Sequence, residues 1–341
     1  MQAKAGKLLI GEGAPVSVQT MYDSALSGCN PSDVVARITS LSLMGCDAIR
    51  FSYISEDDSL PFSYIAEHSP IPVIADIHFD YKMAISALDH GADKVRINPG
   101  NIGAKWKTEE VVRCAASHGA AIRIGLNSGS LPKHDQPVPV HRLMVDTALE
   151  YLSWFESWGF ENTVVSLKST SIDETMEAAR LFSSLSSYPQ HIGITEAGDP
   201  VISAVRSTWA LGRLLEEGIG STLRISMTGD MEDEVAAGVE LLRTLGLRKK
   251  GVRIISCPRC GRHSFDTIGF ENRIRNRLLS IDKDITVAIM GCLVNGPGEA
   301  KEADFAITGM KEKVYLYKHG VLVSEIDSSD AERALFEAIN E

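Results

Sequence analysis

The chain has 341 residues, of which 44% are hydrophobic and 23% charged, and its formal net charge is −11. This composition is typical of a globular protein, and the length allows two domains of about 100–200 residues each. The negative charge argues against a general nucleic-acid or membrane-surface binder, because either class needs an excess of positive charge. No apolar run approaches the roughly 20 residues of a membrane span, and the start lacks a signal-peptide core, so a cytoplasmic protein is expected.

The first part of the chain repeats a short apolar, β-branched run followed by a helical pattern. The expected strands span residues 16–21, 46–53, 71–79, 92–98, 120–127, 162–169, 191–198 and 221–229. Eight strands alternating with helices over about 250 residues predict an α/β fold with an N-terminal (β/α)8 TIM-type barrel. We place this barrel at residues 1–247, with a small hairpin near residues 7–15 at its base.

The pattern changes after residue 247. A strand and a cysteine-rich loop come first, followed by a helix, two strands, a hairpin and a last helix. This order predicts a small α+β domain over residues 248–341.

Side-chain alternation along the strands predicts which residues face the inside of the barrel. Five cations from five strands share this orientation: Arg50, Arg96, Arg123, Lys168 and Arg224. Polar residues on the same faces are Asp76, His78, Asn98, Asn127, Ser166 and Ser226. Glu196 lies on the expected strand 191–198. Burying so many cations, with only Asp76 and Glu196 expected to offset them, is costly unless an anion binds there. Phosphate groups fit best, because several guanidinium groups need several acceptors.

Two of these residues have alternative roles. Glu196 is either a proton donor tuned by its charged surroundings or the ion-pair partner of Arg224 or Lys168. His78 is either a catalytic residue or a structural histidine.

Three cysteines have the spacing of metal ligands. Cys257 and Cys260 form a CPRC motif, and Cys292 follows in GCLVNGPGE. Thiolates at this spacing bind zinc or an iron–sulfur cluster. The nearest fourth ligand is Glu299, a weak oxygen ligand that would leave one metal open to substrate, whereas His263 would complete a zinc site. The other cysteines, Cys29, Cys46 and Cys114, fit small hydrophobic positions.

Five motifs together resemble the 4-hydroxy-3-methylbut-2-enyl diphosphate synthase family. They are INPGNIG (97–103), IRIGLNSGSL (122–131), GITEAGD (193–199), SCPRCGR (256–262) and GCLVNGPGEA (291–300), in the family's order. The resemblance covers nearly the whole chain. There is no large insertion between the two parts, so the chain resembles the short bacterial form.

This resemblance implies a cofactor, a substrate and a reaction. The cofactor is a 4Fe–4S cluster held by Cys257, Cys260, Cys292 and Glu299. The reaction is the reductive, ring-opening dehydroxylation of 2-C-methyl-D-erythritol 2,4-cyclodiphosphate in the non-mevalonate isoprenoid pathway. The five barrel cations would hold the diphosphate with help from Asn127 and Ser226, and Glu196 would act in proton transfer.

Partners are expected from charge and from chain geometry. Residues 248–265 carry no acid and six cations: Arg248, Lys249, Lys250, Arg253, Arg259 and Arg262. Such a cluster of cations favours docking of an acidic flavodoxin or ferredoxin, although the same cations would also balance the negative charge of the cluster and the phosphates.

The helix expected at 232–246 runs back about 22 Å to the barrel base. The cluster domain would then serve the barrel of a second chain in a head-to-tail homodimer, which the resemblance also implies.

Two other functions remain open on the residues alone. One is a pterin-type barrel transferase with an appended zinc domain, and the other is a non-enzymatic iron–sulfur sensor that binds a phosphate metabolite. The first would be colourless, and the second would not turn over the cyclic diphosphate.

Overall fold

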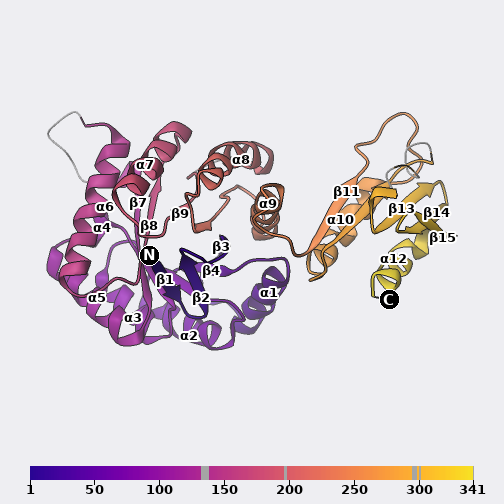
Figure 1. Ribbon diagram of the computed structural model, residues 1–341. Coiled ribbons are helices and arrows are strands. Elements are labelled where there is room, and N and C mark those ends of the chain that lie inside the picture. Colours follow the sequence, from indigo (N-terminus) through magenta and orange to yellow (C-terminus); the bar gives the residue numbers. More distant parts are fainter. Residues whose placement is uncertain (132–137, 196–197, 294–297, 299–300, 341) are drawn as a thin grey trace. The chain divides into compact units, whose positions relative to one another are not determined.

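The computed structural model describes residues 1–131, 138–195, 198–293, 298 and 301–340 (Figure 1). The chain forms two compact units, Met1–Arg248 and Lys249–Glu341, each with its own hydrophobic core. Helices long and apolar enough to cross a membrane are absent from the described residues.

The first unit is the predicted barrel. Its strands, in chain order, are β3 (Ser17–Met21), β4 (Ala48–Ser52), β5 (Val73–Asp76), β6 (Lys94–Ile97), β7 (Ala121–Asn127), β8 (Thr163–Lys168), β9 (His191–Ile192) and β10 (Thr222–Leu223). They form one parallel sheet in the order β8-β7-β6-β5-β4-β3-β10-β9. A parallel bridge from Val165 to Gln190 brings the two ends of this sheet together. The strands are buried on both sides, which explains their nearly continuous apolar sequences.

Helices surround this sheet (Figure 1). They are α1 (Pro31–Leu43), α2 (Ser59–His68), α3 (Tyr81–Asp89), α4 (Pro99–Ile102), α5 (Lys105–His118), α6 (Val140–Ser157), α7 (Ile172–Leu185), α8 (Pro200–Glu216) and α9 (Met231–Thr244). Local sequence starts several of them: Asn30 caps α1 and Asp199 caps α8, each followed by a proline in the first turn.

Strands β9 and β10 are much shorter than the expected strands 191–198 and 221–229. Just beyond β10, the Arg224 amide still donates a hydrogen bond to the Ile192 carbonyl of β9 at 3.2 Å, but further along the backbone bonds to other groups. The Met227 amide, for example, donates a hydrogen bond to the Glu234 carboxylate at 3.3 Å.

A hairpin lies at the base of the barrel as predicted, but it begins at Gln2 and ends at Gly11 instead of spanning residues 7–15. Strands β1 (Gln2–Ala5) and β2 (Leu8–Gly11) pair antiparallel. Their buried side chains, including Ile10, pack against Ala121 and Val164, in the lower parts of β7 and β8. The end of the unit is held at the same base, because the Arg248 guanidinium forms an ion pair with Asp47, just before β4, at 3.2 Å.

The second unit is the predicted α+β domain. Its strands are β11 (Val252–Ser256), β12 (Ile285–Met290), β13 (Phe305–Met310), β14 (Lys313–Lys318) and β15 (Val321–Asp327), and they form one sheet in that order. Helices α10 (Thr267–Leu279) and α12 (Ala331–Asn340) pack on it. Strands β11, β12 and β13 are parallel, so their carboxyl ends meet at one edge of the sheet.

Candidate active site

A polar cavity of about 350 Å³ opens at the carboxyl ends of the barrel strands, where barrel enzymes hold their substrates. All the described residues predicted to face the inside of the barrel line it: Arg50, Asp76, His78, Arg96, Asn98, Arg123, Asn127, Ser166, Lys168, Arg224 and Ser226. Glu196 lies outside the described residues, although its neighbour Thr195 lines the cavity. Alternation along the strands therefore identifies one shared polar site.

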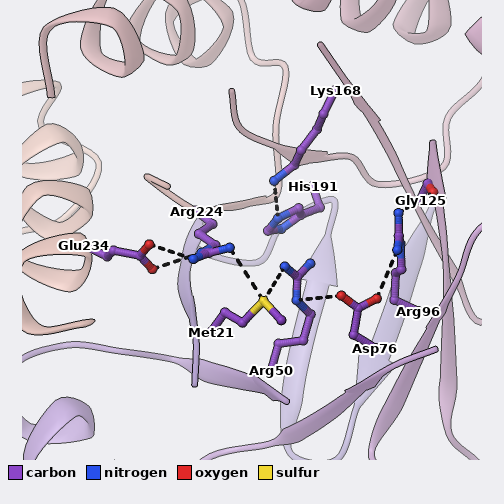
Figure 2. Close-up of polar contacts among 9 residues, drawn as sticks. All are labelled: Met21, Arg50, Asp76, Arg96, Gly125, Lys168, His191, Arg224 and Glu234. Atoms are coloured by element: carbon purple, nitrogen blue, oxygen red, sulfur yellow. Dashed lines mark hydrogen bonds and ion pairs between the residues drawn. The ribbon is translucent and has the colours of Figure 1, made fainter. Parts of the chain in front are cut away.

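Asp76 lies between two of the cations (Figure 2). Its carboxylate is 3.5 Å from Arg50 Nε and 3.1 Å from Arg96 Nη1. Arg96 also donates a hydrogen bond to the Gly125 carbonyl at 2.9 Å. Burial alone would raise the pKa of Asp76, but attraction by Arg50 and then by Arg96 outweighs burial and holds this pKa well below its usual range. Asp76 is therefore a permanent anion that orients two guanidinium groups.

Arg224 has a carboxylate partner that the sequence did not suggest. Glu234, in the first turn of α9, is 3% exposed and accepts two hydrogen bonds from Arg224, at 2.7 and 2.9 Å. The expectation that only Asp76 and Glu196 offset the cations is therefore wrong. One acid among several at the start of a helix carries no periodic signal that it points into a barrel. The sulfur of Met21 lies between Arg50 and Arg224 and accepts a hydrogen bond from Arg50 at 2.9 Å (Figure 2).

Arg123 has no such partner among the described residues. Its side chain is 2% exposed, and the buried Nε and Nη1 have no hydrogen-bond acceptor within the described parts of the chain. Burial, and then repulsion by Arg50 and Arg96, lower its pKa well below the ordinary value. A guanidinium held in this way is destabilising unless an anion reaches it, so Arg123 indicates where the charge of a ligand belongs.

Two glycines keep the lumen side of their strands open. A β-carbon on Gly125 would overlap the Arg96 guanidinium and lie 3.1 Å from its Cγ. A β-carbon on Gly193 would lie 2.6 Å from Lys168 Nζ and 2.8 Å from the Arg224 carbonyl oxygen. Any larger residue would displace the cations, which explains glycine in IRIGLN and HIGIT.

The neutral residues shape the mouth. Asn98 caps α4 by accepting from the Gly100 amide at 3.1 Å, and donates to the Ser130 hydroxyl at 2.8 Å. Asn98 thus ties the loop after β6 to the loop after β7. His78 is exposed at the rim, where an imidazole can meet a ligand as it enters.

Two buried bases below the cavity were missed, Lys94 and His191. Lys94 precedes Arg96 by two positions on β6, so the alternation applied to Arg96 would have found it. His191 would not have been found in this way, because strict alternation from Glu196 places it on the opposite face. His191 contacts Lys168, with Lys168 Nζ 3.1 Å from His191 Nε2 (Figure 2). Lys94 is fully buried, and its Nζ has no hydrogen-bond partner within the described residues.

Replacing Lys94 by Met should stabilise the fold in a pH-dependent way. Burial, and then repulsion by Arg123 and Arg50, lower the pKa of Lys94 to about 7. A base with a lowered pKa in the folded state destabilises the fold most below that pKa, and the penalty fades as pH rises toward its unfolded value of about 10.4. At about 1.4 kcal/mol per pKa unit, Lys94→Met should raise the free energy of unfolding by a few kcal/mol at pH 7, and by little near pH 10.

Urea unfolding at pH 6, 7, 8.5 and 10 measures this difference, with exposed Lys82→Met as the matched control. A gain that is equal at every pH would show that burial of the charge is not its cause.

The three cysteines of the CPRC and GCLVNGPGE motifs gather at one edge of the second sheet. Cys257 follows β11 and Cys292 follows the adjacent parallel strand β12, and the Cys257 amide donates to the Ile289 carbonyl at 2.9 Å. Cys260 lies in the exposed loop between β11 and α10, and Cys292 is buried. Glu299 lies outside the described residues.

The spacing of these cysteines does not fit one zinc ion. With Zn–S near 2.3 Å, a single zinc draws its ligand atoms to within about 4.6 Å of one another. Among the described residues, the groups of three ligand atoms within 4.8 Å do not include these cysteines or His263. The His263 Nδ1 is instead 2.8 Å from the Cys260 carbonyl oxygen. The arrangement therefore does not match a single-zinc site, whereas cysteine thiolates are the ligands that hold iron–sulfur clusters.

Family models match both units. The GcpE TIM-barrel domain matches residues 1–239, and the GcpE protein C-terminal domain matches residues 253–341. Two similar relatives are named 4-hydroxy-3-methylbut-2-en-1-yl diphosphate synthase (flavodoxin). The one from Treponema denticola is 42% identical over 94% of this chain and 89% of its own length. The one from Geobacter sulfurreducens is 42% identical over 98% and 95%.

Solved structures show likeness of the fold alone. The N-acetylneuraminic acid synthetase of Leptospira borgpetersenii matches with a TM-score of 0.51 at 14% identity, over 82% of this chain and 97% of its own. The dihydropteroate synthase of Xanthomonas albilineans matches with a TM-score of 0.51 at 13% identity, over 72% and 96%. This likeness lends no support to a pterin transferase, whereas the matches in sequence extend through both units and every motif. The chain belongs to the GcpE family.

Proposed function

We propose that this chain converts 2-C-methyl-D-erythritol 2,4-cyclodiphosphate to 4-hydroxy-3-methylbut-2-enyl diphosphate, with two electrons supplied through a 4Fe–4S cluster. The observation that carries this proposal is the lumen itself, where Arg123 and Lys168 lie buried without a carboxylate partner among the described residues. The ring opens at a C–O bond to phosphate, and one hydroxyl oxygen leaves as water. This change takes up two electrons and a proton.

The lumen residues bind the diphosphate and hold its charge as it develops. Arg123 faces the anion with donors that no described residue uses. Arg50 and Arg96, oriented by Asp76, and Arg224, oriented by Glu234, present their guanidinium groups in fixed directions. Donors that need no rearrangement stabilise the separating phosphate better than donors that must first reorient. Glu196 is placed by its motif to move the proton.

The second unit would hold the cofactor. Cys257, Cys260 and Cys292 supply three thiolates, and Glu299 the fourth, weaker ligand. When bound, the cluster supplies electrons and a Lewis-acidic iron. The buried position of Cys292 beside the sheet keeps part of this site away from water.

Flavodoxin is the proposed electron donor, in keeping with the names of the relatives. Only some of the cations in residues 248–265 remain available for docking of flavodoxin, because others form ion pairs within the chain. Arg248 pairs with Asp47, Lys250 with Asp282 and Arg259 with Asp266. The exposed cations that remain are Lys249, Arg253 and Arg262.

We further propose a head-to-tail homodimer in which the cluster unit of one chain serves the lumen of its partner. Support comes from Arg248, which is tied to the barrel base, the end opposite the cavity. The outer face of α8 offers an apolar surface that a second copy would cover. Val201, Val205 and Trp209 are 74%, 67% and 54% exposed, and a groove of about 620 Å³ separates α8 from α9.

Anaerobic turnover of the cyclic diphosphate tests the function. With dithionite as reductant, cluster-loaded protein should form the linear diphosphate, and protein without iron should not. With flavodoxin as reductant, the double variant Lys249→Glu, Arg253→Glu should raise KM for flavodoxin several-fold and leave the dithionite rate unchanged. No product with either reductant would refute the proposed reaction, and equal losses with both would refute only the docking surface.

A further inference from the structure

Three buried residues form a row that begins in the cavity and leads away from it. Lys168 lines the cavity and is 7% exposed. Its Nζ is 3.1 Å from His191 Nε2, and His191 Nδ1 is 2.5 Å from the Thr222 hydroxyl. His191 and Thr222 are each 1% exposed and lie opposite each other on β9 and β10. Lys168 already has an expected role in binding the diphosphate, whereas His191 and Thr222 have no role so far.

The surroundings of Lys168 are positively charged on several sides. Arg123 on β7, Arg50 on β4, Arg96 and Lys94 on β6, and Arg224 after β10 all raise the cost of a charge near this row. Asp76 forms ion pairs with Arg50 and Arg96, and Glu234 forms an ion pair with Arg224, so neither carboxylate is paired with Lys168. Burial, and then repulsion by Arg123 and Arg50, lower the pKa of Lys168 well below its ordinary value. Burial, and then repulsion by Lys168, likewise lower the pKa of His191.

A neutral imidazole in this place can serve Lys168 in both of its charge states. When Lys168 is an ammonium, it donates to His191 Nε2, and Nδ1–H donates to the Thr222 oxygen. When Lys168 is an amine, His191 carries its proton on Nε2 and donates to the amine nitrogen, while the Thr222 hydroxyl donates to Nδ1. Both arrangements keep the two hydrogen bonds of the row. An asparagine or a second cation in place of His191 would not reproduce this at the same distances.

We propose that Lys168 takes up a proton when the diphosphate enters the lumen, and that His191, supported by Thr222, is the positioning residue that holds Lys168 before and after this change. The inference rests on the proposed function, because it takes the ligand to be a diphosphate. In the empty lumen, burial and the neighbouring cations favour the amine form of Lys168, whereas an incoming anion favours the ammonium. Binding of the anion would therefore increase the charge of this side chain.

Coupling of this kind makes affinity depend on pH. If one proton enters with the ligand, affinity falls up to about tenfold per pH unit as pH rises between the lowered pKa of Lys168 and its ordinary value. The cyclic diphosphate is a suitable probe, because each of its phosphates carries one strongly acidic group and does not titrate near neutral pH. Without reductant it binds but does not react.

Calorimetry in buffers of different ionisation enthalpy measures the protons taken up by cluster-loaded protein. Wild type should take up about one proton more than Lys168→Arg, since an arginine is already charged. Because Lys94 is a second buried amine, the comparison is repeated in the Lys94→Met background, where the difference should persist. Glu196→Gln should leave the uptake unchanged. Equal uptake by wild type and Lys168→Arg, or loss of the uptake in Glu196→Gln, would overturn the proposal.

The positioning role has its own test. His191→Leu removes the acceptor from the ammonium and should move the pH profile of affinity about one unit toward acid. Thr222→Val should move it in the same direction, and Thr222→Ser should restore the wild-type profile. A uniform loss of affinity at every pH would show that His191 is merely structural. Binding of inorganic diphosphate, measured in parallel, separates the outcomes. This probe itself titrates near neutral pH, so only the difference in proton uptake between wild type and Lys168→Arg is compared. A difference with this probe, together with no binding of the cyclic compound, would refute the proposed substrate and leave the coupling intact.

Discussion

Replacing Arg123 by Met is expected to weaken binding of the cyclic diphosphate about a hundredfold, which corresponds to roughly 3 kcal/mol for a lost charge-assisted contact. The same substitution should raise thermal stability. Arg123 is 2% exposed, and its buried Nε and Nη1 lack acceptors within the described residues, so the empty protein bears the cost of this charge. Methionine fills similar space without the charge.

Arg123→Met is expected to lower the affinity and to raise the thermal stability. This combination distinguishes the result from misfolding, which would lower both quantities. Calorimetric titration gives the affinity, and thermal unfolding gives the stability. The matched control is Arg113→Met on α5, where the side chain is 69% exposed and pairs with Glu109. Arg113→Met should change neither quantity appreciably. A destabilised Arg123→Met protein with unchanged affinity would mean that the lumen charge has a structural role.

Mixing two inactive chains should restore activity if the site is shared between protomers. Arg123→Met lacks a competent lumen and Cys257→Ser lacks a complete cluster site, so each homodimer should be nearly inactive. In a mixed dimer, the intact lumen of one chain meets the intact cluster unit of the other. With random pairing, half of the dimers are mixed and each has one working site, so roughly a quarter of the wild-type activity should appear.

The measurement needs subunit exchange before reconstitution of the cluster, followed by turnover with dithionite. A matched mixture of Arg123→Met with Arg123→Met, Cys257→Ser should stay inactive, because no chain then contributes an intact lumen. Absence of recovery in the first mixture, with subunit exchange verified by differently tagged chains, would contradict the head-to-tail arrangement. It would leave the lumen and the reaction unaffected.

Local pattern was enough to predict the barrel and most of its lumen. Apolar strands that alternate with helices have few ways to bury both faces, and side chains on a strand alternate strictly. Arg50, Arg96, Arg123, Lys168 and Arg224 could therefore be assigned to one cavity before any strand was placed beside another. The same rule places Lys94 on the face of Arg96. It fails for His191, because β9 ends at Ile192 and strict alternation does not extend from His191 to Glu196.

By itself, the sequence determined the order of the elements, the cations inside the barrel and the cysteine spacing, because each depends on neighbours a few residues apart. Only the tertiary structure decided which cation meets which carboxylate. Glu234 reaches Arg224 because α9 returns along the barrel, and Lys168 meets His191 because β8 and β9 bring the sheet ends together. Such pairings depend on distances between elements far apart in the chain, and burial makes them decisive, since a buried charge keeps its cost until a partner is placed beside it.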